Sequence, residues 1–354
     1  MNHNLLITTG GSGGHVVPAT ILYEHLMKNT NVIISTDKRG LKYLDKDIYE
    51  LEIIDTPKLN NIFILPFSFI KILYLSLKSF FILKKRKIKK VFSTGGYMSL
   101  PVVLAARFLN LDIYLIEPNQ VLGRANKFFL NFCKKIFCYA NDIKKYPNNL
   151  KNKIIVIHPL VRKNIYKLEP FTKYKNKFTL LIVGGSQGAS IFDKNLKDKI
   201  INISKKFPIK VIQQTNEKNI THLSNIYLKN NIENEVFSFD KNFFNYMHQA
   251  DLCITRAGAS TLAELSVLNV PFIAVPLATS KDDHQLENAF FYQNLDCCWT
   301  IEQKFFDNKI EDFLKYILSD RSDYLKKKEN LKKLNYQNTW INVNQKILEI
   351  INEN

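Results

Sequence analysis

The chain has 354 residues, 46% of them hydrophobic, so it can bury the cores of about two domains, and a largely disordered chain is excluded. Lysine and arginine outnumber aspartate and glutamate by 50 to 32, which gives a net charge of +18. This excess favours an anionic partner such as a phosphorylated ligand, an acidic lipid surface or nucleic acid, unless it reflects a compositional bias toward lysine, asparagine and isoleucine.

The five cysteines and seven histidines show no metal-binding or disulfide pattern. No two cysteines form a CxxC pair and no histidines cluster at zinc-ligand spacing, so we expect no metal site and a reduced, cytoplasmic protein. The first residues, MNHNLLITTGG, lack the basic start and the long apolar core of a signal peptide. They are typical of a buried β-strand that ends in a glycine turn.

The stretch TTGGSGGHVVPA, residues 8–19, follows this strand and is rich in glycine. Backbone N–H groups at the start of a helix bind phosphate well when no Cβ blocks its approach. The dinucleotide pattern GxGxxG would need glycine where the chain has Val16, and no GKS or GKT of a Walker loop follows. The loop therefore predicts a phosphate site of neither a nicotinamide enzyme nor a P-loop NTPase.

The segment from Ile62 to Lys90 stands apart by its apolar composition. Lys71 and Lys78 interrupt it on one helical face, and a basic cluster from Lys84 to Lys90 follows. This pattern favours an amphipathic helix that lies in a membrane surface with its lysines at anionic headgroups. A core helix with a solvated basic end is the alternative. A spanning helix is disfavoured because it would disrupt the first domain.

Two further segments repeat the pattern of an apolar run, a glycine pair and a helix: residues 91–101 (VFSTGGYMSLP) and 180–190 (LLIVGGSQGAS). Helical patterns alternate with short strands, which we expect at 31–35, 113–116, 154–157, 209–213 and 272–275. This alternation predicts an α/β protein of two Rossmann-like domains, each a doubly wound parallel sheet with right-handed crossovers.

The polar and charged stretch between Leu160 and Phe178 is expected to link the two domains. We place the first domain at residues 1–162 and the second at residues 163–335. The tail has a helical pattern from about Asp323, and its last part, residues 336–354, is expected to pack back on the first domain.

In the second domain, TRAGASTLAE has two interpretations. In one, Gly258 makes a tight turn, Thr261 caps a helix, and Glu264 reaches back to complete a capping box. In the other, the Glu264 carboxylate accepts hydrogen bonds from ribose hydroxyls. A similar choice holds for SKDDHQLENA, residues 280–289, which is either a solvated polar loop or a helix start with one polar face formed by His284, Gln285 and Asn288.

Taken in order, GGSGGHVVPA, TGGYMSLP, VGGSQGA, TRAGASTLAE and DDHQLENA resemble the MurG family of peptidoglycan glycosyltransferases. The motifs run from Leu5 to about Ala289, and the chain length agrees to its end. The resemblance implies a GT-B fold, in which two Rossmann-like domains face a cleft. It also implies inverting transfer of N-acetylglucosamine from UDP-GlcNAc to the C4 hydroxyl of MurNAc in lipid I, the undecaprenyl-diphosphate-linked MurNAc-pentapeptide. This reaction forms lipid II, and it needs neither a metal nor a cofactor.

The resemblance places the UDP-GlcNAc donor mostly on the second domain. Glu264 matches a glutamate that binds the ribose, and Arg162 matches an arginine near the donor. The other residues matched to donor binding contact the uridine diphosphate or the sugar hydroxyls: Ser186, Gln187, Ala259, Ser260, Thr261, Gln285 and Asn288. A helix N-terminus at this place can stabilise the leaving diphosphate without a metal.

The resemblance places the acceptor on the first domain, with the first two glycine loops at the lipid-linked diphosphate. His15 is then the leading candidate for the general base, because a histidine at the positive end of a helix tends to stay neutral and can accept a proton. The alternative for His15 is packing within its loop. Glu117 is the second catalytic candidate. The other residues assigned to the acceptor are Ser12, Gly13, Gly14, Gly95, Gly96, Tyr97, Asn119 and Asn126.

One position departs from the family pattern. Where the family has His-Glu-Gln-Asn, residues 116–119 are IEPN, so that Ile116 replaces a histidine and Pro118 replaces a glutamine. If the missing histidine were the base, the chain would be inactive or would use another group. The change therefore moves the assignment of the base to His15 and Glu117.

The expected partners are UDP-N-acetylglucosamine, the lipid-linked acceptor and an anionic membrane surface, with no nucleic acid. The expected location is the cytoplasmic face of the inner membrane, as a peripheral protein. Two alternatives stay open. One is a GT-B transferase for another acceptor, and the other is a non-enzymatic basic protein that binds nucleic acid or membrane, which only the charge of +18 and the lysine clusters support.

Overall fold

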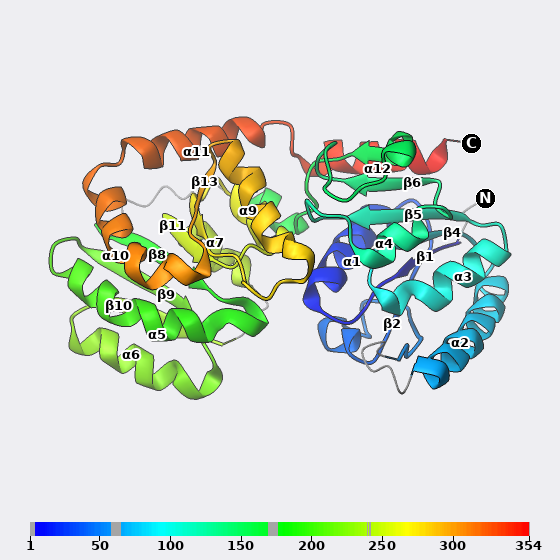
Figure 1. Cartoon of the computed structure of the whole chain (residues 1–354), viewed down its shortest axis with the longest axis horizontal. Helices are drawn as coiled ribbons and strands as arrows, with labels where there is room; N and C mark the ends of the chain where they lie inside the picture. The colour runs from blue at the N-terminus through cyan, green and yellow to red at the C-terminus, as the bar shows by residue number, and fades with distance from the viewer. Residues whose placement is uncertain (1–3, 58–64, 169–175, 239, 241, 354) are drawn as a thin grey trace. The chain divides into compact units, whose positions relative to one another are not determined.

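A computed structural model of the chain (Figure 1) describes residues 4–57, 65–168, 176–238, 240 and 242–353. They form two compact units, one of residues 1–163 with 339–354 and one of residues 164–338. In the described residues each unit holds one sheet, and all paired strands are parallel. The predicted fold class, two Rossmann-like parallel-sheet domains, is therefore confirmed.

The sheet of the first unit has the strand order β3-β2-β1-β4-β5-β6-β7. Its strands are β1 (Asn4–Thr8), β2 (Val32–Thr36), β3 (Leu51–Ile53), β4 (Ile88–Ser93), β5 (Asp112–Glu117), β6 (Lys135–Cys138) and β7 (Ile154–Val156). The direction of winding reverses between β1 and β4. Open α/β sheets bind ligands at such a switch point, beyond the carboxyl ends of the strands.

Helices cover both faces of this sheet because apolar side chains alternate along its strands. Leu5 and Ile7 of β1 lie in one core cluster, and Leu6 lies in the other. The first cluster includes residues of α1 (Gly13–Leu26) and α12 (Trp340–Asn352). The second includes residues of α2 (Leu65–Lys85), α3 (Leu100–Phe108) and α4 (Arg124–Phe129).

The end of the chain packs on the first unit. Helix α12, red in Figure 1, buries Val343 and Ile347 in the core that it shares with α1. The Trp340 ring stacks on buried His25 with 3.6 Å between the ring centroids, and burial lowers the pKa of His25 to about 3. The helical tail expected from about Asp323 is thus two helices, α11 (Ser322–Leu334) in the second unit and α12 in the first.

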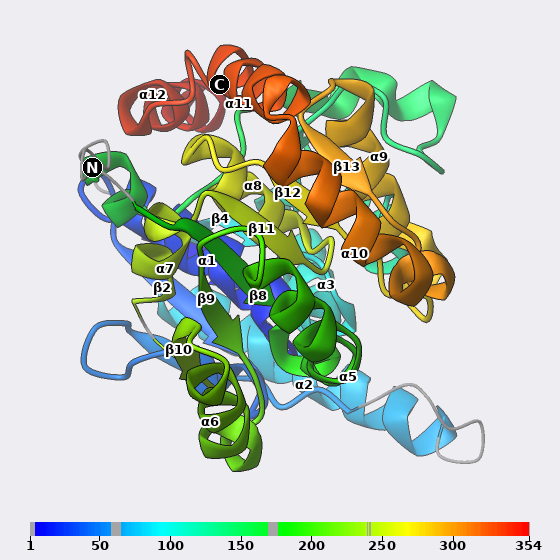
Figure 2. The same cartoon turned by 90° about the vertical axis from the view of Figure 1, so that its left-hand side faces the viewer.

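The sheet of the second unit has the order β10-β9-β8-β11-β12-β13, and Figure 2 shows β10, β9, β8 and β11 beside one another. The strands are β8 (Phe178–Val183), β9 (Ile209–Gln214), β10 (Glu233–Phe237), β11 (Leu252–Thr255), β12 (Phe272–Ala274) and β13 (Cys298–Thr300). The winding reverses between β8 and β11. The five strands expected from the sequence are β2, β5, β7, β9 and β12, each within one residue of its expected bounds.

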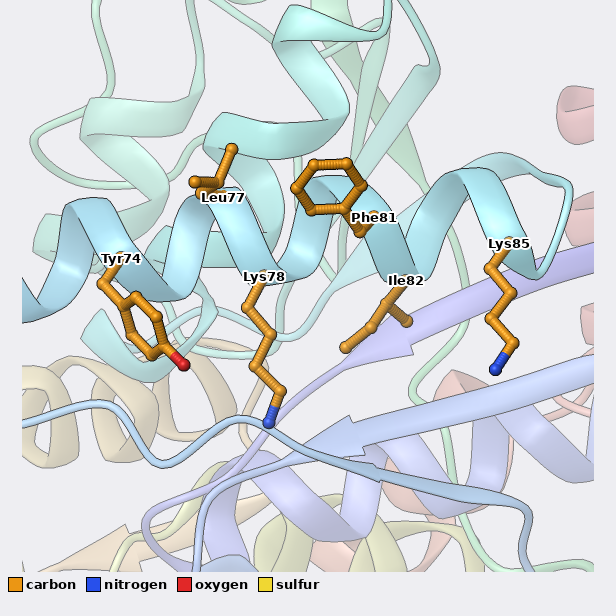
Figure 3. Close-up of a pocket in the computed structure, with 6 residues that line it drawn as sticks. All are labelled: Tyr74, Leu77, Lys78, Phe81, Ile82 and Lys85. Atoms are coloured by element: carbon orange, nitrogen blue, oxygen red, sulfur yellow. The ribbon is translucent and has the colours of Figure 1, made fainter.

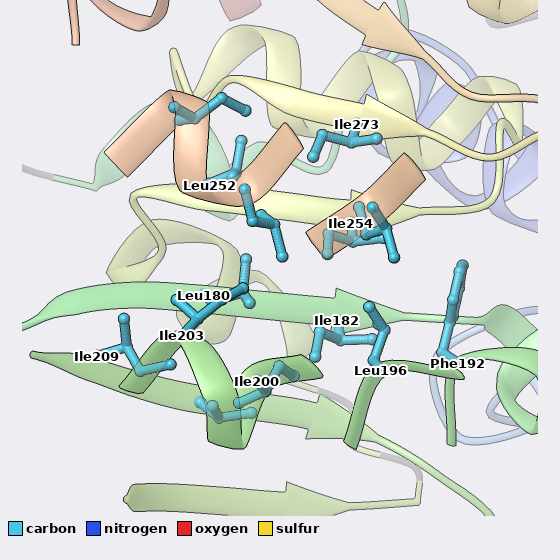
Figure 4. Packing of buried hydrophobic residues seen from close by; sticks show 14 of the residues in the cluster. Leu180, Ile182, Phe192, Leu196, Ile200, Ile203, Ile209, Leu252, Ile254 and Ile273 are labelled. Atoms are coloured by element: carbon cyan, nitrogen blue, oxygen red, sulfur yellow. The ribbon is translucent and has the colours of Figure 1, made fainter. Parts of the chain in front are cut away.

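Two helical layers enclose this second sheet. One layer contains α5 (Gly185–Ser204), α6 (Ile220–Lys229) and α10 (Gln303–Ser319). Figure 4 shows Leu196 and Ile200 of α5 facing Leu180 and Ile182 of β8. The other layer contains α7 (Phe243–Gln249), α8 (Ala259–Val267), α9 (His284–Asn294) and α11. Short 3-10 helices lie at Gly40–Tyr43, Tyr97–Ser99, Asn148–Lys153, Lys163–Lys167, Glu217–Asn219 and Lys281–Asp283.

Candidate functional site

The loops that follow β1, β4 and β5 meet at the carboxyl edge of the first sheet, because β4 pairs with both β1 and β5. Both glycine pairs at this edge adopt left-handed backbone conformations, with φ of +148° and +75° at Gly10 and Gly11 and of +81° and +79° at Gly95 and Gly96. Residues with a Cβ rarely adopt these angles. The glycine pairs are therefore required by the path of the backbone.

His15 lies between these two loops. Helix α1 begins at Gly13 after the N-cap Ser12, and the His15 ring nitrogen Nδ1 lies 2.9 Å from the carbonyl oxygen of Thr94. A carbonyl oxygen only accepts hydrogen bonds, so Nδ1 donates to it, and in a neutral imidazole Nε2 then presents a lone pair. A Cβ built on Gly96 would lie 3.3 Å from Nε2, so the glycine leaves space beside this nitrogen. The arrangement gives the edge a proton acceptor.

The Glu117 carboxylate, in contrast, is fully engaged by hydrogen bonds. Glu117 is 2% exposed. Its Oε1 accepts hydrogen bonds from Asn119, at 3.2 Å from the backbone N and 3.0 Å from Nδ2. Its Oε2 accepts from Gly123 N at 2.8 Å and from Asn126 Nδ2 at 3.0 Å. Two donors per oxygen leave this carboxylate poorly placed to take a proton from a substrate. This geometry favours a positioning role for Glu117 over the predicted role as a base.

Asn126 extends this network beneath the second glycine loop. Its Nδ2 also donates to the carbonyl oxygen of Ile116 at 3.0 Å, and a Cβ on Gly95 would lie 3.2 Å from the same nitrogen. The Ile116 side chain is 1% exposed and belongs to the core cluster on the α1 face of the sheet. A histidine at this position would face that core, so its replacement takes no proton-transfer group away from the edge.

Asp37 and Arg39 also belong to this edge, although the sequence analysis did not select them. Asp37 follows β2, its side chain is fully buried, and its Oδ1 accepts from the backbone N of Gly11 at 2.8 Å and of Gly40 at 2.9 Å. Arg39 Nε donates to Asp37 Oδ2 at 2.6 Å. The only signal in the sequence is an acidic residue directly after an apolar strand, which is too common to indicate a site.

The loops after β8 and β11 form the corresponding edge of the second sheet. Gly185 has a φ of +64°, and its N–H donates to Gln214 Oε1 at 3.0 Å. Ser186 and Gln187 lie in the first turn of α5, and their side chains fall outside the described part of the structure. This turn directs helical N–H groups toward the edge, as an anion site requires.

Helix α8 begins three residues earlier than a capping box of Thr261 and Glu264 would need. Its N-cap is Gly258 in an extended conformation, so Ala259, Ser260 and Thr261 are the first three helical residues. The interpretation of Thr261 as the cap is therefore wrong, because Gly258 takes the N-cap position and Thr261 already lies inside the helix. The backbone N–H groups of this turn have no partner four residues back in the helix and are suited to an anion. Glu264 lies one turn further on and is 3% exposed.

The polar residues of α9 hold the neighbouring loops. Asn288 Nδ2 donates to the carbonyl oxygen of Ala257 at 3.1 Å, and Gln285 Oε1 accepts from Leu277 N at 2.9 Å. The motif SKDDHQLENA thus contains the start of a helix, at His284, rather than only a solvated loop. These contacts show that both side chains support the edge on which the sequence analysis placed the donor.

Arg256 is a third residue, after Asp37 and Arg39, that was not predicted from the sequence. It lies between β11 and Gly258, is 8% exposed, and donates to the carbonyl oxygens of Val275 and Pro276 at 3.1 and 3.4 Å. Its guanidinium lies 5.4 Å from the ring centroid of Phe192, and burial lowers the pKa of the arginine. These contacts hold a buried cation between the loop after β12 and helix α5.

Arg162 is the one predicted donor residue outside the second unit. It lies in the first unit, after β7 and two residues before the second unit begins, and is half-buried. The structure therefore does not group it with the edge of β8 and β11. In the part of the chain that the structure describes, no three His, Cys, Asp or Glu side chains are placed to hold a metal ion.

Comparisons with known proteins agree along the whole chain. Residues 5–138 match the glycosyltransferase family 28 N-terminal domain, and residues 179–339 match the C-terminal domain of that family. The UDP-N-acetylglucosamine--N-acetylmuramyl-(pentapeptide) pyrophosphoryl-undecaprenol N-acetylglucosamine transferase of Pelagibacter ubique (strain HTCC1062) is 51% identical and covers 100% of both chains. The transferase of the same name from Rickettsia canadensis (strain McKiel) is 38% identical over 84% of this chain and 86% of its own.

Solved structures share the fold at lower identity. The crystal structure of Acinetobacter baumannii MurG has a TM-score of 0.77 at 23% identity and covers 99% of this chain and 100% of its own. UDP-GlcNAc 2-epimerase from Neisseria meningitidis, bound to UDP-GlcNAc, has a TM-score of 0.68 at 14% identity with the same coverage.

The network around Glu117 leads to a test of its role. In Glu117→Gln, the new NH₂ group would face two existing N–H donors, and an unsatisfied buried donor costs about 1–3 kcal/mol. We expect a fall of at least this size in the free energy of unfolding, measured by denaturant titration. Glu329→Gln, at a 55% exposed glutamate in a surface ion pair, should change it by less than about 1 kcal/mol. If Glu117→Gln loses turnover but keeps the wild-type stability, the carboxylate acts in proton transfer and not in positioning.

Proposed function

The chain belongs to glycosyltransferase family 28 and, within it, to the MurG family, and we propose that the edge of its first sheet binds the acceptor and the edge of its second sheet binds the donor. The enzyme transfers N-acetylglucosamine from UDP-N-acetylglucosamine to MurNAc of the undecaprenyl-diphosphate-linked pentapeptide, and the product is lipid II. The full-length similarity to transferases with this activity in their names carries the conclusion. The geometry of the two edges supports the roles that we propose for individual residues.

The first unit holds the acceptor in this proposal. The C4 hydroxyl of MurNAc gives its proton to His15 Nε2 as its oxygen attacks the anomeric carbon from the face opposite the leaving group. The new C–O bond forms while the bond from the anomeric carbon to the UDP oxygen breaks, so the transfer inverts the sugar. Ser12, Gly13 and Gly14 begin the helix that faces the acceptor diphosphate, and Gly95, Gly96 and Tyr97 form the neighbouring loop. Glu117, Asn119 and Asn126 hold the loop after β5, which packs beside Gly95.

The second unit holds the donor. The first turn of α8, from Ala259 to Thr261, and that of α5, with Ser186 and Gln187, direct N–H groups to the leaving diphosphate. Glu264 accepts hydrogen bonds from the ribose hydroxyls. The sugar hydroxyls are held by Gln285 and Asn288. Arg162, in the first unit, is assigned to the donor by the family resemblance alone.

A transfer assay tests the reaction itself. Purified protein is mixed with labelled UDP-N-acetylglucosamine and a short-chain analogue of the lipid-linked MurNAc-pentapeptide, and labelled disaccharide product is expected. Transfer to a different prenyl-diphosphate acceptor but not to this one would replace the proposed acceptor. Absence of any transfer, together with salt-dependent binding of nucleic acid that UDP does not displace, would overturn the proposal in favour of a basic binding protein.

His15 and Glu264 should affect different halves of the reaction. His15→Ala removes the proton acceptor, and general bases typically contribute about 10²- to 10⁴-fold, so kcat should fall by this factor with an unchanged Kd for UDP-N-acetylglucosamine. Glu264→Ala should instead weaken donor binding and leave the acceptor KM unchanged. Steady-state kinetics and donor titration measure both effects. A wild-type kcat in His15→Ala would remove this histidine from the mechanism.

Helix α2 gives the first unit an apolar outer face. Leu75 and Leu83 are buried against the core with α3, whereas Phe67, Ile70 and Tyr74 are 73%, 63% and 65% exposed. Residues Pro66–Lys85 are long and apolar enough to cross a membrane, but the inner face of the helix is part of the soluble fold. We therefore propose that α2 lies in the membrane surface and that the enzyme is peripheral, at the cytoplasmic face of the inner membrane. Residues 62–64 of the predicted segment lie outside the described residues.

Basic side chains accompany this apolar face. Figure 3 shows Tyr74, Lys78 and Lys85 projecting to the same side of α2, around a shallow pocket of about 360 Å³ that Leu77, Phe81 and Ile82 also line. Apolar side chains that enter the acyl boundary and lysines that reach anionic headgroups are the two elements of interfacial binding. The pairing of the two on one helix supports an anionic membrane as the partner.

Membrane binding should depend on the outer face of α2. Phe69 and Leu73 are 61% and 52% exposed, and burial of such side chains is worth about 1.5–3 kcal/mol each. The double variant Phe69→Asp, Leu73→Asp should lose at least tenfold in partitioning to anionic phosphatidylglycerol vesicles, measured by co-sedimentation, and keep its activity on a water-soluble acceptor. Leu228→Asp, at a 59% exposed leucine on α6, is the control and should bind as the wild type does. Unchanged binding of the double variant would contradict the proposal.

A further inference from the structure

A buried carboxylate connects three loops at the acceptor edge of the first sheet. Asp37, after β2, accepts hydrogen bonds through Oδ1 from Gly11, in the loop after β1, and from Gly40. A Cβ built on Gly10 would lie 2.6 Å from the same oxygen, so the first glycine loop is packed directly on this carboxylate. Its other oxygen, Oδ2, binds the Arg39 guanidinium through both Nε and Nη2.

Arg39 carries this connection to the second glycine loop. Its Nη1 donates to the hydroxyl oxygen of Tyr97, and its guanidinium carbon lies 5.0 Å from the centroid of the Tyr97 ring. Tyr97 directly follows Gly95 and Gly96, and both Arg39 and Tyr97 are partly exposed. One carboxylate and one guanidinium thus join the loops after β1, β2 and β4.

The direction of the hydrogen bond fixes the chemistry of the Tyr97 hydroxyl. A guanidinium has donors and no acceptor, so the phenol oxygen must accept from Arg39. The phenol O–H is then left to donate to another group, and the adjacent positive charge strengthens it as a donor. A donor of this kind suits an anionic oxygen better than a neutral hydroxyl.

We propose that Arg39 is a positioning residue for the acceptor, which acts by holding the Tyr97 hydroxyl as a hydrogen-bond donor to an anionic oxygen of that substrate. The proposal rests on the proposed function, which places the acceptor beside the first two glycine loops. Arg39 itself is engaged by Asp37 and Tyr97, so its effect reaches the substrate through Tyr97. The anionic oxygen belongs either to the diphosphate or to a carboxylate of the peptide.

A double-mutant cycle on Arg39 and Tyr97 tests the proposal. Arg39→Met and Tyr97→Phe should each raise the acceptor KM by about tenfold to a hundredfold, the range for a hydrogen bond to a charged group, and should leave the donor KM unchanged. The double variant should be no worse than either single variant, because both changes remove the same hydrogen bond. An acceptor analogue without the peptide should show the same increase if the anion is the diphosphate, and none if it is a peptide carboxylate.

Two further variants separate positioning from folding and from overall charge. Arg39→Lys can keep the ion pair with Asp37, but its side chain has a single nitrogen where Arg39 uses Nε and Nη2 for Asp37 and Nη1 for Tyr97. It should therefore unfold at the wild-type temperature and still show the raised acceptor KM. Lys38→Met removes one positive charge from the same loop, where Lys38 is exposed and paired with Asp55 at 3.7 Å, and it should have a wild-type acceptor KM.

Several results would overturn the proposal. In the first, the increases in acceptor KM caused by Arg39→Met and Tyr97→Phe multiply in the double variant. In the second, these variants raise the donor KM as much as the acceptor KM. In the third, Lys38→Met raises the acceptor KM as much as Arg39→Met does. A wild-type acceptor KM in Arg39→Lys would likewise show that the contact with Tyr97 is not needed. Failure of the proposed function is distinguishable from all of these, because the wild-type protein itself would then transfer no sugar.

Discussion

Parallel strand pairing is the constraint on which both edges of this protein depend. When all strands of a sheet run the same way, every loop that follows a strand leaves from the same edge, and reversal of the winding separates two neighbouring loops there. Pairing of β4 with β1 brings Thr94 to His15 across 79 positions of sequence. Pairing of β11 with β8 does the same for the loops at Gly258 and Gly185. Strand pairing in each sheet thus brings the loops of an edge together, and the loops supply its side chains and backbone N–H groups.

Two buried carboxylates then fix the loops of the first unit. Asp37 is fully buried and Glu117 is 2% exposed, and a buried charge is tolerated only when its oxygens are hydrogen-bonded. Both carboxylates use backbone N–H donors, from Gly11 and Gly40 in one case and from Asn119 and Gly123 in the other. The loops that follow the strands and the two carboxylates therefore depend on each other, since backbone N–H groups of the loops satisfy the charges and the charges hold the loops.

Local sequence patterns predict those parts of the two edges that depend only on residues close to each other in the chain. Apolar runs place the strands, and glycine pairs mark the turns that need positive φ, as at Gly95 and Gly96. The start of α8 was misplaced because Gly258, in an extended conformation, takes the N-cap position that a threonine usually fills. The roles of Glu117 and Asp37 depend on partners that only the fold brings together. Strand alternation could have placed Ile116 in the core, because it follows Tyr114 on the same face of β5.

At the first edge, the hydrogen-bond partners of His15 and Tyr97 determine whether each of these two side chains can donate or accept a further hydrogen bond. The Thr94 carbonyl can only accept, so His15 donates to it through Nδ1, and a neutral ring then presents a lone pair at Nε2. The Arg39 guanidinium can only donate, so Tyr97 must present an O–H. In the proposed reaction, the acceptor hydroxyl gives its proton to the His15 ring, and an anionic oxygen of the acceptor accepts a hydrogen bond from the Tyr97 hydroxyl. The hydrogen-bonding character of this edge is thus set by Thr94 and Arg39, the partners of His15 and Tyr97.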